Sequence, residues 1–335
     1  MNNNVAIIGC GAIFNRHVES IINTPNFNLV AVCDSQKEIA DNKSKKYNCS
    51  AFYSIEECLK KSNANFYVLA TPNNLHYKHA VMCINSGKKV LIEKPATLNV
   101  RQLEEIIKLS NDKKVDAYGV LQVRLNNSVT VVKKCLEKGL LGKLRGVNLV
   151  QRWQRPVEYF SGWRSIPDVG GGTLHEVGIH YVDILQYLVG VPKVIASSAY
   201  NTKHVDADIE DTVYSLIDYK EFGGTIEVTI SAEPHNLECS ISILGSNGFI
   251  KLGGKALNLV ESYNFLSHGA KKQFESIMSN HENVTYIPPN NYGSYLGSCP
   301  NHLGVYQNLN MFKLENTKNS LQIIENIYEK LGKKY

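Results

Sequence analysis

The sequence predicts an α/β protein of two domains, the first built on a parallel, doubly wound sheet and the second on a mostly antiparallel open sheet. Its 335 residues suggest two domains at roughly 100–200 residues each. Up to residue 122, short apolar runs alternate with helical patterns, as in a parallel sheet with helical crossovers. Between residues 194 and 252, strand-like segments are joined by short turns instead. We therefore expect domains at 1–122 and 123–335, with a terminal helix able to pack back on the first domain.

In the first domain, residues that interrupt regular structure bound each apolar run. Pro72 and Pro95 follow two expected strands, and Gly87 follows a helical pattern, where glycine commonly caps a helix. We expect strands at 5–9, 29–34, 66–71, 90–93 and 115–122, with helices at 15–23, 76–86 and 103–110.

The second domain opens with a helical pattern and a longer strand. Three consecutive glycines, 170–172, then precede an apolar helix that ends before Gly190 and Pro192. Gly223-Gly224 is interpreted as a turn, and Ser246-Asn247-Gly248 as a hairpin connection. We expect helices at 127–138, 174–189 and 320–331, strands at 145–153, 213–218, 225–231, 239–244 and 249–252, and loops over 262–300.

Composition and charge exclude several classes of function. Hydrophobic residues make up 43% of the chain and charged residues 20%, which is typical of a globular protein rather than a disordered one. The net charge is only +5, and no Lys/Arg block resembles a nucleic-acid-binding arm. No apolar run approaches the roughly 20 residues of a membrane span. We expect neither a nucleic acid nor a membrane as a partner.

The eight cysteines are scattered, and none forms a Cys-x-x-Cys pair. Disulfide frameworks are typical of much smaller secreted chains, so we interpret these cysteines as reduced, mostly buried thiols. The first four residues lead directly into a strand-like segment, without the basic and apolar regions of a signal peptide. Both observations predict a cytoplasmic protein.

The first strand is followed by a Gly-x-Gly turn and a helix, an arrangement that binds the pyrophosphate of a dinucleotide. Gly9 permits the tight turn, and Gly11 lets backbone amides approach the phosphates at the helix N-terminus. Phe14 replaces the third glycine of the GxGxxG pattern, so the motif alone is weak. Asp34, at the end of the second strand, supplies a carboxylate for the ribose hydroxyls. Because a carboxylate repels a 2′-phosphate, we predict NAD over NADP, a preference that the nearby Lys37 weakens.

Two later strands of the first domain also end in polar sequences. Residues 70–76, ATPNNLH, follow one strand, and Glu93-Lys94-Pro95 follows the next. Ligands bind at the carboxyl ends of strands in open α/β sheets. A lysine at the end of a buried strand is costly unless it has partners or a function. The alternative is an ordinary lysine that reaches the solvent.

Taken together, these motifs resemble the Gfo/Idh/MocA oxidoreductases. The resemblance covers nearly the whole chain and implies a Rossmann domain followed by an α/β domain whose open antiparallel sheet often mediates oligomerisation. It also implies hydride transfer between C4 of a nicotinamide and a hydroxyl carbon, usually of a sugar or cyclitol. The motifs that carry it are GCGAIF at 9–14, CD at 33–34, ATPNNLH at 70–76, EKP at 93–95 and GGGTLHEVGIHYVDIL at 170–185.

By position in these motifs, the resemblance makes Lys94 the lysine near the reacting hydroxyl and His180 the residue that transfers its proton. Glu176 stands where the family usually has an aspartate or an amide, which leaves its exact role open. Residues i and i+4 share a helix face, so Glu176 and His180 can point into one cleft, with Asp183 one turn away. His175 invites a metal interpretation, but HExxxH lacks the paired histidines of HExxH. We therefore expect no metal ligands.

Within the family, the chain most resembles the UDP-N-acetylglucosaminuronate 3-dehydrogenases of the WlbA/WbpB type, which act in surface-polysaccharide synthesis. The supporting stretches are residues 119–126, 151–164 and 301–306. Arginines can bind a pyrophosphate or a uronate carboxylate, and Tyr or Trp can stack on a uracil or a sugar face. Each of these side chains could equally serve packing or the surface. The expected substrate-binding residues are Arg124, Arg155, Tyr159, Trp163, Arg164 and Asp183.

The resemblance thus implies an NAD-dependent enzyme, with NADP as a possible cofactor, and a UDP-linked sugar as substrate. It also implies a homodimer or homotetramer. Two alternatives remain open: a dehydrogenase or ketoreductase of another sugar, deoxysugar nucleotide or cyclitol, and a non-catalytic NAD-binding regulator, against which the intact Lys94 and His180 argue. The expected catalytic residues are Lys94, His180 and Glu176, and the expected cofactor-binding residues are Gly9, Gly11, Ala12, Ile13, Asp34, Thr71, Pro72, Asn74, His76, Glu93, Lys94 and Gln122.

Overall fold

The computed structural model of the chain describes residues 2–281, 291 and 296–333. The chain divides into two compact units, each discontinuous in sequence. The last helix, α11 (Lys318–Lys330), begins in the first unit and ends in the second. Among the described residues, no helix is both long enough and apolar enough to cross a membrane. The first unit comprises residues 1–121, 168–170 and 302–321, and the second comprises 122–167, 171–301 and 322–335.

A parallel sheet with the strand order β3-β2-β1-β4-β5-β6 forms the centre of the first unit. Its inner strands are almost continuously apolar because both faces of the sheet are covered. The strand order reverses between β1 and β4, and ligands bind beyond the carboxyl ends of the strands at such a point. The strands are β1 (Asn3–Ile8), β2 (Phe27–Cys33), β3 (Ser50–Phe52), β4 (Phe66–Leu69), β5 (Lys89–Ile92) and β6 (Ala117–Gly119).

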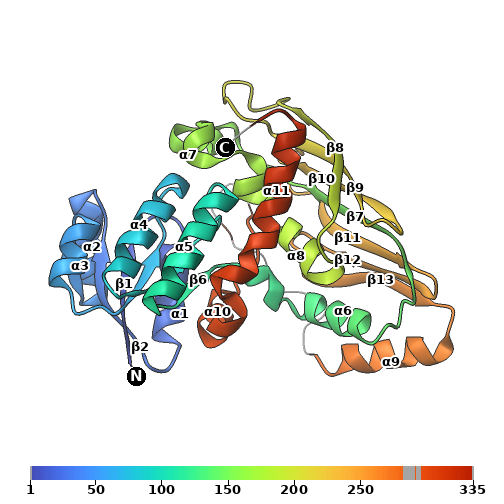
Figure 1. Cartoon of the computed structure of the whole chain (residues 1–335), viewed down its shortest axis with the longest axis horizontal. Helices are drawn as coiled ribbons and strands as arrows, with labels where there is room; N and C mark the ends of the chain where they lie inside the picture. The colour runs from blue at the N-terminus through green and yellow to red at the C-terminus, as the bar shows by residue number, and fades with distance from the viewer. Residues whose placement is uncertain (1, 282–290, 292–295, 334–335) are drawn as a thin grey trace. The chain divides into compact units, whose positions relative to one another are not determined.

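Helices connect the successive strands of this sheet, and α4 and α5 lie side by side (Figure 1). The segment 302–321 returns to the same unit, where α10 (His302–Gln307) packs against α1 and the short turn η6 (Leu314–Thr317) packs against β6. The helices of the first unit that precede this segment are α1 (Phe14–Ile22), α2 (Lys37–Tyr47), α3 (Ile55–Lys61), α4 (Asn73–Asn85) and α5 (Val100–Lys113).

The second unit contains a sheet of seven strands in the order β13-β12-β11-β7-β10-β9-β8. Only the β7–β10 pair is parallel, so the predicted class of a mostly antiparallel sheet beside a parallel one is confirmed. Side chains alternate along its strands between a buried face and an open face. The strands are β7 (Leu144–Arg152), β8 (Lys193–Tyr200), β9 (Thr212–Asp218), β10 (Gly223–Thr229), β11 (Glu238–Gly245), β12 (Gly248–Gly253) and β13 (Leu259–Phe265).

Helices cover the buried face of this sheet, with α8 against β7 and α6 against β12. The predicted helix at 174–189 is divided: residues Leu174–Gly178 form the π-helical turn η4, and α8 continues from Ile179 to Val189. Single π-helical turns occur often at functional sites. The remaining helical elements are η1 (Gln122–Leu125), α6 (Asn127–Glu137), η2 (Val157–Phe160), η3 (Gly162–Ser165), α7 (Pro167–Gly170), α9 (His268–Ser279) and η5 (Leu309–Phe312).

Several elements had no range in the sequence-based expectation, among them α2, β3, α3, β8, α9 and α10. Helix α2 buries only Ala40 and therefore carries no apolar stripe to reveal it, and its neighbours β3 and α3 are short. The stretch 262–300, expected to be loops, contains the end of β13 and the helix α9. Ser267 caps α9 by accepting the Ala270 N–H, a start signal that the surrounding polar residues obscured. Residues 282–290 and 292–295 of that stretch lie outside the described part of the chain.

The predicted turn at Gly223-Gly224 is wrong, because both glycines belong to β10. The turn comes earlier, where the Tyr219 N–H donates to the Phe222 carbonyl at 2.9 Å. Gly224 is needed for a different reason: a Cβ there would lie 2.0 Å from the Val147 carbonyl oxygen of the neighbouring strand β7. Close approach of two backbones, and not a turn, explains this glycine.

We expect Gly224→Ala to lower the free energy of unfolding by about 1–3 kcal/mol, because the new methyl group forces β7 and β10 apart. Gly223→Ala is the matched control, since its Cβ would lie 3.4 Å from the Ile217 carbonyl oxygen, an ordinary contact. Urea denaturation of the three proteins measures both changes. Equal stability of the two variants would show that the β7–β10 contact does not require glycine.

Candidate active site

The turn after β1 is shaped by Gly9. Its φ of +97° lies in the left-handed region, and a Cβ there would lie 2.4 Å from the Ala70 carbonyl oxygen. The Gly9 N–H donates to the Cys33 carbonyl at 2.8 Å. Only glycine therefore fits where the turn passes between the ends of β2 and β4.

Gly11 is under no such steric restriction. A Cβ on Gly11 would meet nothing within 4 Å, and Gly11 and Ala12 are both exposed. Helix α1 begins at Phe14, and its N-cap residue, Ile13, forms no side-chain hydrogen bond with the amides of the first turn. The open space beside Gly11 suits a phosphate group, because the N-terminus of the helix that follows attracts negative charge.

Asp34 ties the glycine turn to the end of β2. Its carboxylate accepts N–H bonds from Cys10 at Oδ2 and from Gln36 at Oδ1, both at 2.9 Å. A carboxylate offers about four acceptor positions, so each oxygen can accept a further hydrogen bond. The side chain is partly exposed, which leaves it accessible to ribose hydroxyls. Lys37, which was expected to weaken the preference for NAD over NADP, has its Nζ 5.2 Å from the ring centroid of Tyr53.

His76 joins the loops that follow β4 and β5. Its Nδ1 lies 2.7 Å from the Pro95 carbonyl oxygen, and its Nε2 lies 2.9 Å from the Thr71 carbonyl oxygen. The two strand-end motifs found in the sequence are thus positioned together by one buried ring. The Thr71 hydroxyl also contacts His79, and burial lowers the pKa of His79 to about 4. Of two other expected cofactor residues, Pro72 is the partly exposed N-cap residue of α4, and Asn74 is exposed in the first turn of that helix.

The Glu93 carboxylate lies at a buried junction of three chain segments. Its Oε1 is 2.9 Å from Nε2 of His17 in α1 and 3.4 Å from Nε2 of His302 in α10. Its Oε2 accepts the Lys94 N–H at 3.1 Å, and His17 Nδ1 lies 2.9 Å from the Tyr306 hydroxyl. Burial opposes ionisation of Glu93, but the contacts with His17 and His302 hold its pKa well below the usual range. Burial lowers the pKa of His17.

This junction determines the backbone position of Lys94, whose side chain is partly exposed. Sequence reasoning did not include His17, His302 or Tyr306 among the site residues. A histidine on the buried face of a helix looks like ordinary packing when read alone, and His17 is 76 positions from Glu93 and 289 from Tyr306. Residues 301–306 were recognised as a resemblance, but nothing in them indicated their partners.

In the second unit, Glu176 and His180 are both buried, with 4% and 6% exposure. Glu176 lies on the π-helical turn η4, and His180 lies at the start of α8. The Glu176 carboxylate accepts hydrogen bonds at Oε2 from Arg164 Nε at 3.1 Å and from the Tyr159 hydroxyl at 3.4 Å. The structure thus joins an expected catalytic carboxylate to two expected substrate-binding residues that lie 12 and 17 positions away.

Arginine and aromatic side chains stack around Glu176. The Arg164 guanidinium carbon lies 4.3 Å from the ring centroid of Trp163 and 5.3 Å from that of Tyr159. Arg155 is buried and lies 4.6 Å from the ring centroid of Trp153 and 5.5 Å from that of Tyr159. Burial and the Glu176 carboxylate raise the pKa of Tyr159. Such stacks hold guanidinium groups in fixed planes, which suits recognition of an anionic, ring-bearing ligand.

Arg124 and Asp183 form a buried, bidentate ion pair. Arg124 Nε and Nη2 donate to the Asp183 oxygens at 2.7 and 2.6 Å, and Gln186 donates to Asp183 at 3.0 Å. Both were expected to bind the substrate, whereas these contacts pair them with each other in the core of the second unit. Gln122, an expected cofactor residue, is buried at the start of the second unit and donates to the Cys299 carbonyl at 3.5 Å.

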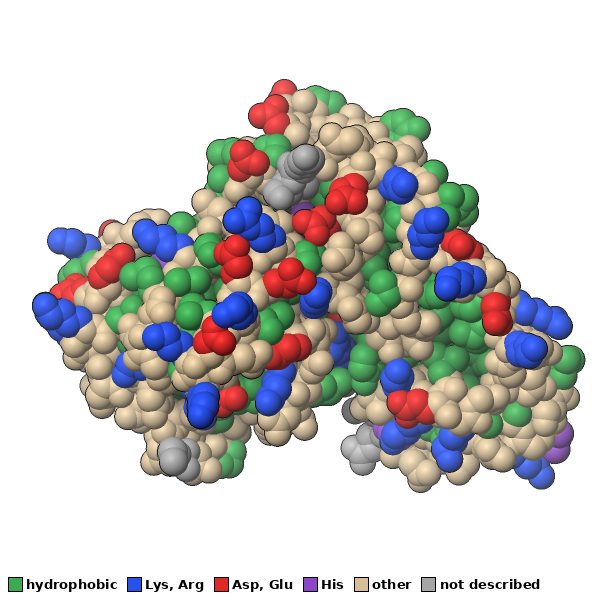
Figure 2. All heavy atoms as spheres, viewed as in Figure 1, with side chains coloured by type: hydrophobic (Ala, Val, Ile, Leu, Met, Phe, Trp, Pro, Cys, Tyr) green, Lys and Arg blue, Asp and Glu red, His purple; other side chains and the backbone are tan. Residues whose placement is uncertain are grey.

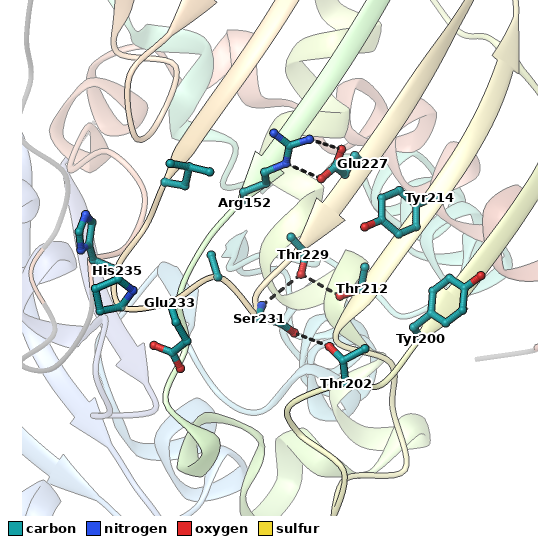
Figure 3. Close-up of a pocket in the computed structure, with 13 residues that line it drawn as sticks. Arg152, Tyr200, Thr202, Thr212, Tyr214, Glu227, Thr229, Ser231, Glu233 and His235 are labelled. Carbon is teal, nitrogen blue, oxygen red and sulfur yellow. Dashed lines mark hydrogen bonds and ion pairs between the residues drawn. The ribbon is translucent and has the colours of Figure 1, made fainter.

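The open face of the second sheet carries a groove of about 800 Å³ that contains none of the expected site residues (Figure 3). Arg152 pairs with Glu227 there, beside Tyr200 and Tyr214. On the face of the molecule shown in Figure 2, Lys and Arg side chains are interspersed with Asp and Glu. That face therefore presents no broad positive field of the kind that binds nucleic acids.

Comparison with known proteins identifies the family. Residues 3–120 match the model of the oxidoreductase family with an NAD-binding Rossmann fold, and residues 108–251 match the GFO/IDH/MocA C-terminal domain. The chain belongs to the Gfo/Idh/MocA family of oxidoreductases. The resemblance inferred from the motifs is therefore confirmed, as are an NAD-binding first domain and an enzyme of the oxidoreductase class.

Individual relatives of this Gfo/Idh/MocA protein differ in what they act on. The WlbA dehydrogenase from Bordetella pertussis, solved with NADH and UDP-GlcNAcA, is 27% identical and has a TM-score of 0.87, over 98% of this chain and 95% of that one. D-glucoside 3-dehydrogenase of Escherichia coli is 26% identical over 242 residues, 65% of this chain and 67% of that protein. The NADP-dependent scyllo-inositol 2-dehydrogenase IolW of Bacillus subtilis is 27% identical over 179 residues. That match covers 52% of this chain and about half, 49%, of the relative.

The residues of the first unit fit the dinucleotide. The open space beside Gly11 at the start of α1 suits the pyrophosphate, and the Asp34 carboxylate suits the ribose. We expect Asp34→Asn to weaken NAD binding about 10- to 100-fold, as loss of charge-assisted hydrogen bonds predicts, and to weaken NADP binding less. Asp41→Asn, on α2 and bonded to the Tyr53 hydroxyl, is the control. Fluorescence titration with both cofactors measures the ratio, and an unchanged NAD/NADP ratio in Asp34→Asn would contradict the assignment.

Proposed function

We propose that this protein oxidises the C3 hydroxyl of a UDP-linked N-acetylhexosaminuronate to a ketone, as a step in the synthesis of a surface-polysaccharide sugar. The observation that carries the proposal is the Glu176 cluster, in which a buried carboxylate is bound by Arg164 and Tyr159 beside stacked aromatic rings. The full-length likeness to a WlbA dehydrogenase solved with UDP-GlcNAcA supports it.

The proposed reaction removes a hydride from C3 and a proton from its hydroxyl oxygen. The nicotinamide of NAD, when bound, accepts the hydride. His180 takes the hydroxyl proton, a task for which an imidazole is suited near neutral pH. Lys94 donates a hydrogen bond to the same oxygen and stabilises the negative charge that develops there. The products are a ketone, a reduced nicotinamide and one proton held by His180.

Glu93 and Glu176 are assigned different tasks, because their partners differ. Glu93 contacts buried histidines and accepts the Lys94 N–H, so it holds the backbone of the lysine in place. Glu176 shares Arg164 and Tyr159 with the proposed substrate site, so it orients these groups toward the sugar nucleotide. Arg155 and Arg164 are assigned to the pyrophosphate or the uronate carboxylate, both of which an arginine binds with paired hydrogen bonds. Trp163 and Tyr159 are assigned to a ring of the substrate.

A second candidate function is oxidation or reduction of a free sugar, another sugar nucleotide or a cyclitol. The D-glucoside and scyllo-inositol dehydrogenases among the relatives favour it, and the second of these uses NADP. A substrate without a nucleotide leaves the arginine and aromatic side chains near Glu176 without a ligand. Competition by UDP separates a UDP-sugar substrate from a free sugar or a cyclitol, and comparison of UDP-GlcNAc-uronate with UDP-GlcNAc and UDP-glucose separates one sugar nucleotide from another. Binding of NAD with no turnover of any sugar would instead favour a non-catalytic regulator.

We expect Lys94→Met to lower kcat about 10²- to 10³-fold and His180→Asn about 10²- to 10⁴-fold, through loss of oxygen stabilisation and of the proton acceptor respectively. Lys78→Met and His268→Gln, both at exposed positions, are the controls. The measurement is NADH formation from UDP-GlcNAc-uronate, with UDP-GlcNAc, UDP-glucose, glucose and myo-inositol compared in parallel. Near-normal turnover in either active-site variant, or oxidation of glucose alone by the unaltered protein, contradicts the proposal.

We further propose that the protein works in the cytoplasm as a homodimer or homotetramer formed through the open face of the second sheet. All eight cysteines are free thiols, which suits a reducing compartment. Tyr214, Leu216, Leu244 and Phe249 expose between 41% and 50% of their surface on that face, and apolar side chains gathered on one exposed face suit an interface between subunits.

We expect Leu216→Lys to dissociate the assembly, because it places a charge within the apolar face. Leu266→Lys is the control, since Leu266 is 84% exposed in the segment that follows β13. Sedimentation velocity at several protein concentrations measures the subunit number. A monomeric unaltered protein, or an assembly that Leu216→Lys leaves intact, would place the interface elsewhere or exclude it.

A further inference from the structure

A buried cluster in the first unit has the composition of a metal site. His17 in α1, Glu93 at the end of β5 and His302 in α10 each offer one ligand atom, and these atoms all lie within 4.8 Å of one another. Two imidazoles and a carboxylate form a common ligand set for zinc. We propose that Nε2 of His17, Oε1 of Glu93 and Nε2 of His302 bind a divalent cation of the zinc class. This site is separate from HExxxH at 175–180 and does not depend on the proposed substrate.

The two distances from the Glu93 carboxylate to the histidines are close to those between zinc ligands, and all three ligand atoms lie within 4.8 Å of one another. Tetrahedral ligands about 2.0–2.1 Å from the ion lie about 3.3–3.4 Å from one another. Glu93 Oε1 and His302 Nε2 are 3.4 Å apart, which matches this spacing. Glu93 Oε1 and His17 Nε2 are 2.9 Å apart, so they must separate by a few tenths of an ångström to receive the ion. Such a shift is within the reach of side-chain rotation.

His302 supplies an independent argument. Its side chain is 2% exposed, and among the described residues neither of its ring nitrogens has a hydrogen-bond partner. A buried polar group without a partner costs about 1–3 kcal/mol, so native proteins rarely keep one without a reason. Its Nε2 lies 3.4 Å from Glu93 Oε1, a separation that is long for a hydrogen bond but suits two ligands of one ion. Coordination gives that nitrogen a partner.

The surroundings of the cluster resemble the outer contacts of a metal site. The Tyr306 hydroxyl lies 2.9 Å from His17 Nδ1 and can accept its N–H. In that tautomer Nε2 carries a lone pair that can bind the ion. Glu93 Oε2 accepts the Lys94 N–H, which orients Oε1 toward both histidines. An ion at this place would join α1, the loop after β5 and α10. It would stabilise the same backbone that carries Lys94.

The competing explanation is a network of hydrogen bonds in which a proton, and no metal, lies between His17 and Glu93. That explanation satisfies His17 through Glu93 and Tyr306 but leaves the His302 ring with only a long contact. Zinc binding to the stripped protein separates the two explanations, because a network of this kind has no specific affinity for the ion.

The experiment removes metals from the full-length protein with a chelator and titrates zinc against a chromogenic indicator. We expect about one tight zinc per chain, weakened at least about 100-fold by His302→Gln and Glu93→Gln and about 10- to 100-fold by Tyr306→Phe. His268→Gln, at an exposed position of α9, is the matched control and should bind as the unaltered protein does. Equal affinity in the unaltered protein and His302→Gln, or no tight zinc at all, overturns the proposal.

Cobalt(II) substitution of the unaltered protein provides a second measurement that does not depend on variants that fold. Visible bands of a four-coordinate ion with nitrogen and oxygen ligands support the site. A near-ultraviolet thiolate band, or the spectrum of hydrated cobalt, counts against it, because the first would place the ion on a cysteine and the second would leave it unbound. Circular dichroism checks that each variant retains its fold.

Discussion

The buried carboxylate of Glu93 is the constraint on which the first unit depends. A charge removed from water must be surrounded by compensating groups, and these come from α1, from α10 and from the N–H of the next residue. Segments that lie far apart in the chain are thereby held at one point. Lys94 follows directly, so the requirement to satisfy Glu93 also determines where the proposed catalytic lysine leaves the sheet. Asp34 links the ends of β1 and β2, and His76 links the loops after β4 and β5, so contacts of this kind connect the four strand ends proposed to face the cofactor.

The second unit also contains buried charges, and they are compensated in two ways. The ion pair of Arg124 and Asp183 is nearly inaccessible to water and bidentate, so each charge is compensated by the other within the core. Glu176 is also buried, but its partners, Arg164 and Tyr159, belong to a segment of short 3₁₀ turns rich in arginine and aromatic residues. The Arg124–Asp183 pair connects η1 to α8. The Glu176 contacts instead place a carboxylate and a guanidinium group beside aromatic rings. Only the second has the composition expected of a ligand site, which is why the proposed function rests on it.

The predictability of each element followed the strength of its local signal. Strands β1, β4 and β5 were found because parallel strands covered on both faces are continuously apolar. Helix α2 was missed because it buries one residue, and Gly223-Gly224 was misinterpreted because a glycine needed for close backbone approach looks the same as one needed for a turn. Of the site, Gly9, Asp34 and the Glu93-Lys94-Pro95 motif carried recognisable patterns. His17, His302 and Tyr306 carried none, since a single buried histidine has no signature of its own.

The sequence by itself determined the fold class, the family and the NAD-binding character of the first domain, because each rests on short motifs and on periodicity that neighbouring residues express. The tertiary structure alone decided which distant side chains meet: Glu93 with His17 and His302, Glu176 with Arg164 and Tyr159, and Arg124 with Asp183. The physical reason is that a buried charge is compensated by whichever partner the packing of whole elements brings within a few ångströms. No local pattern in the chain records that partner.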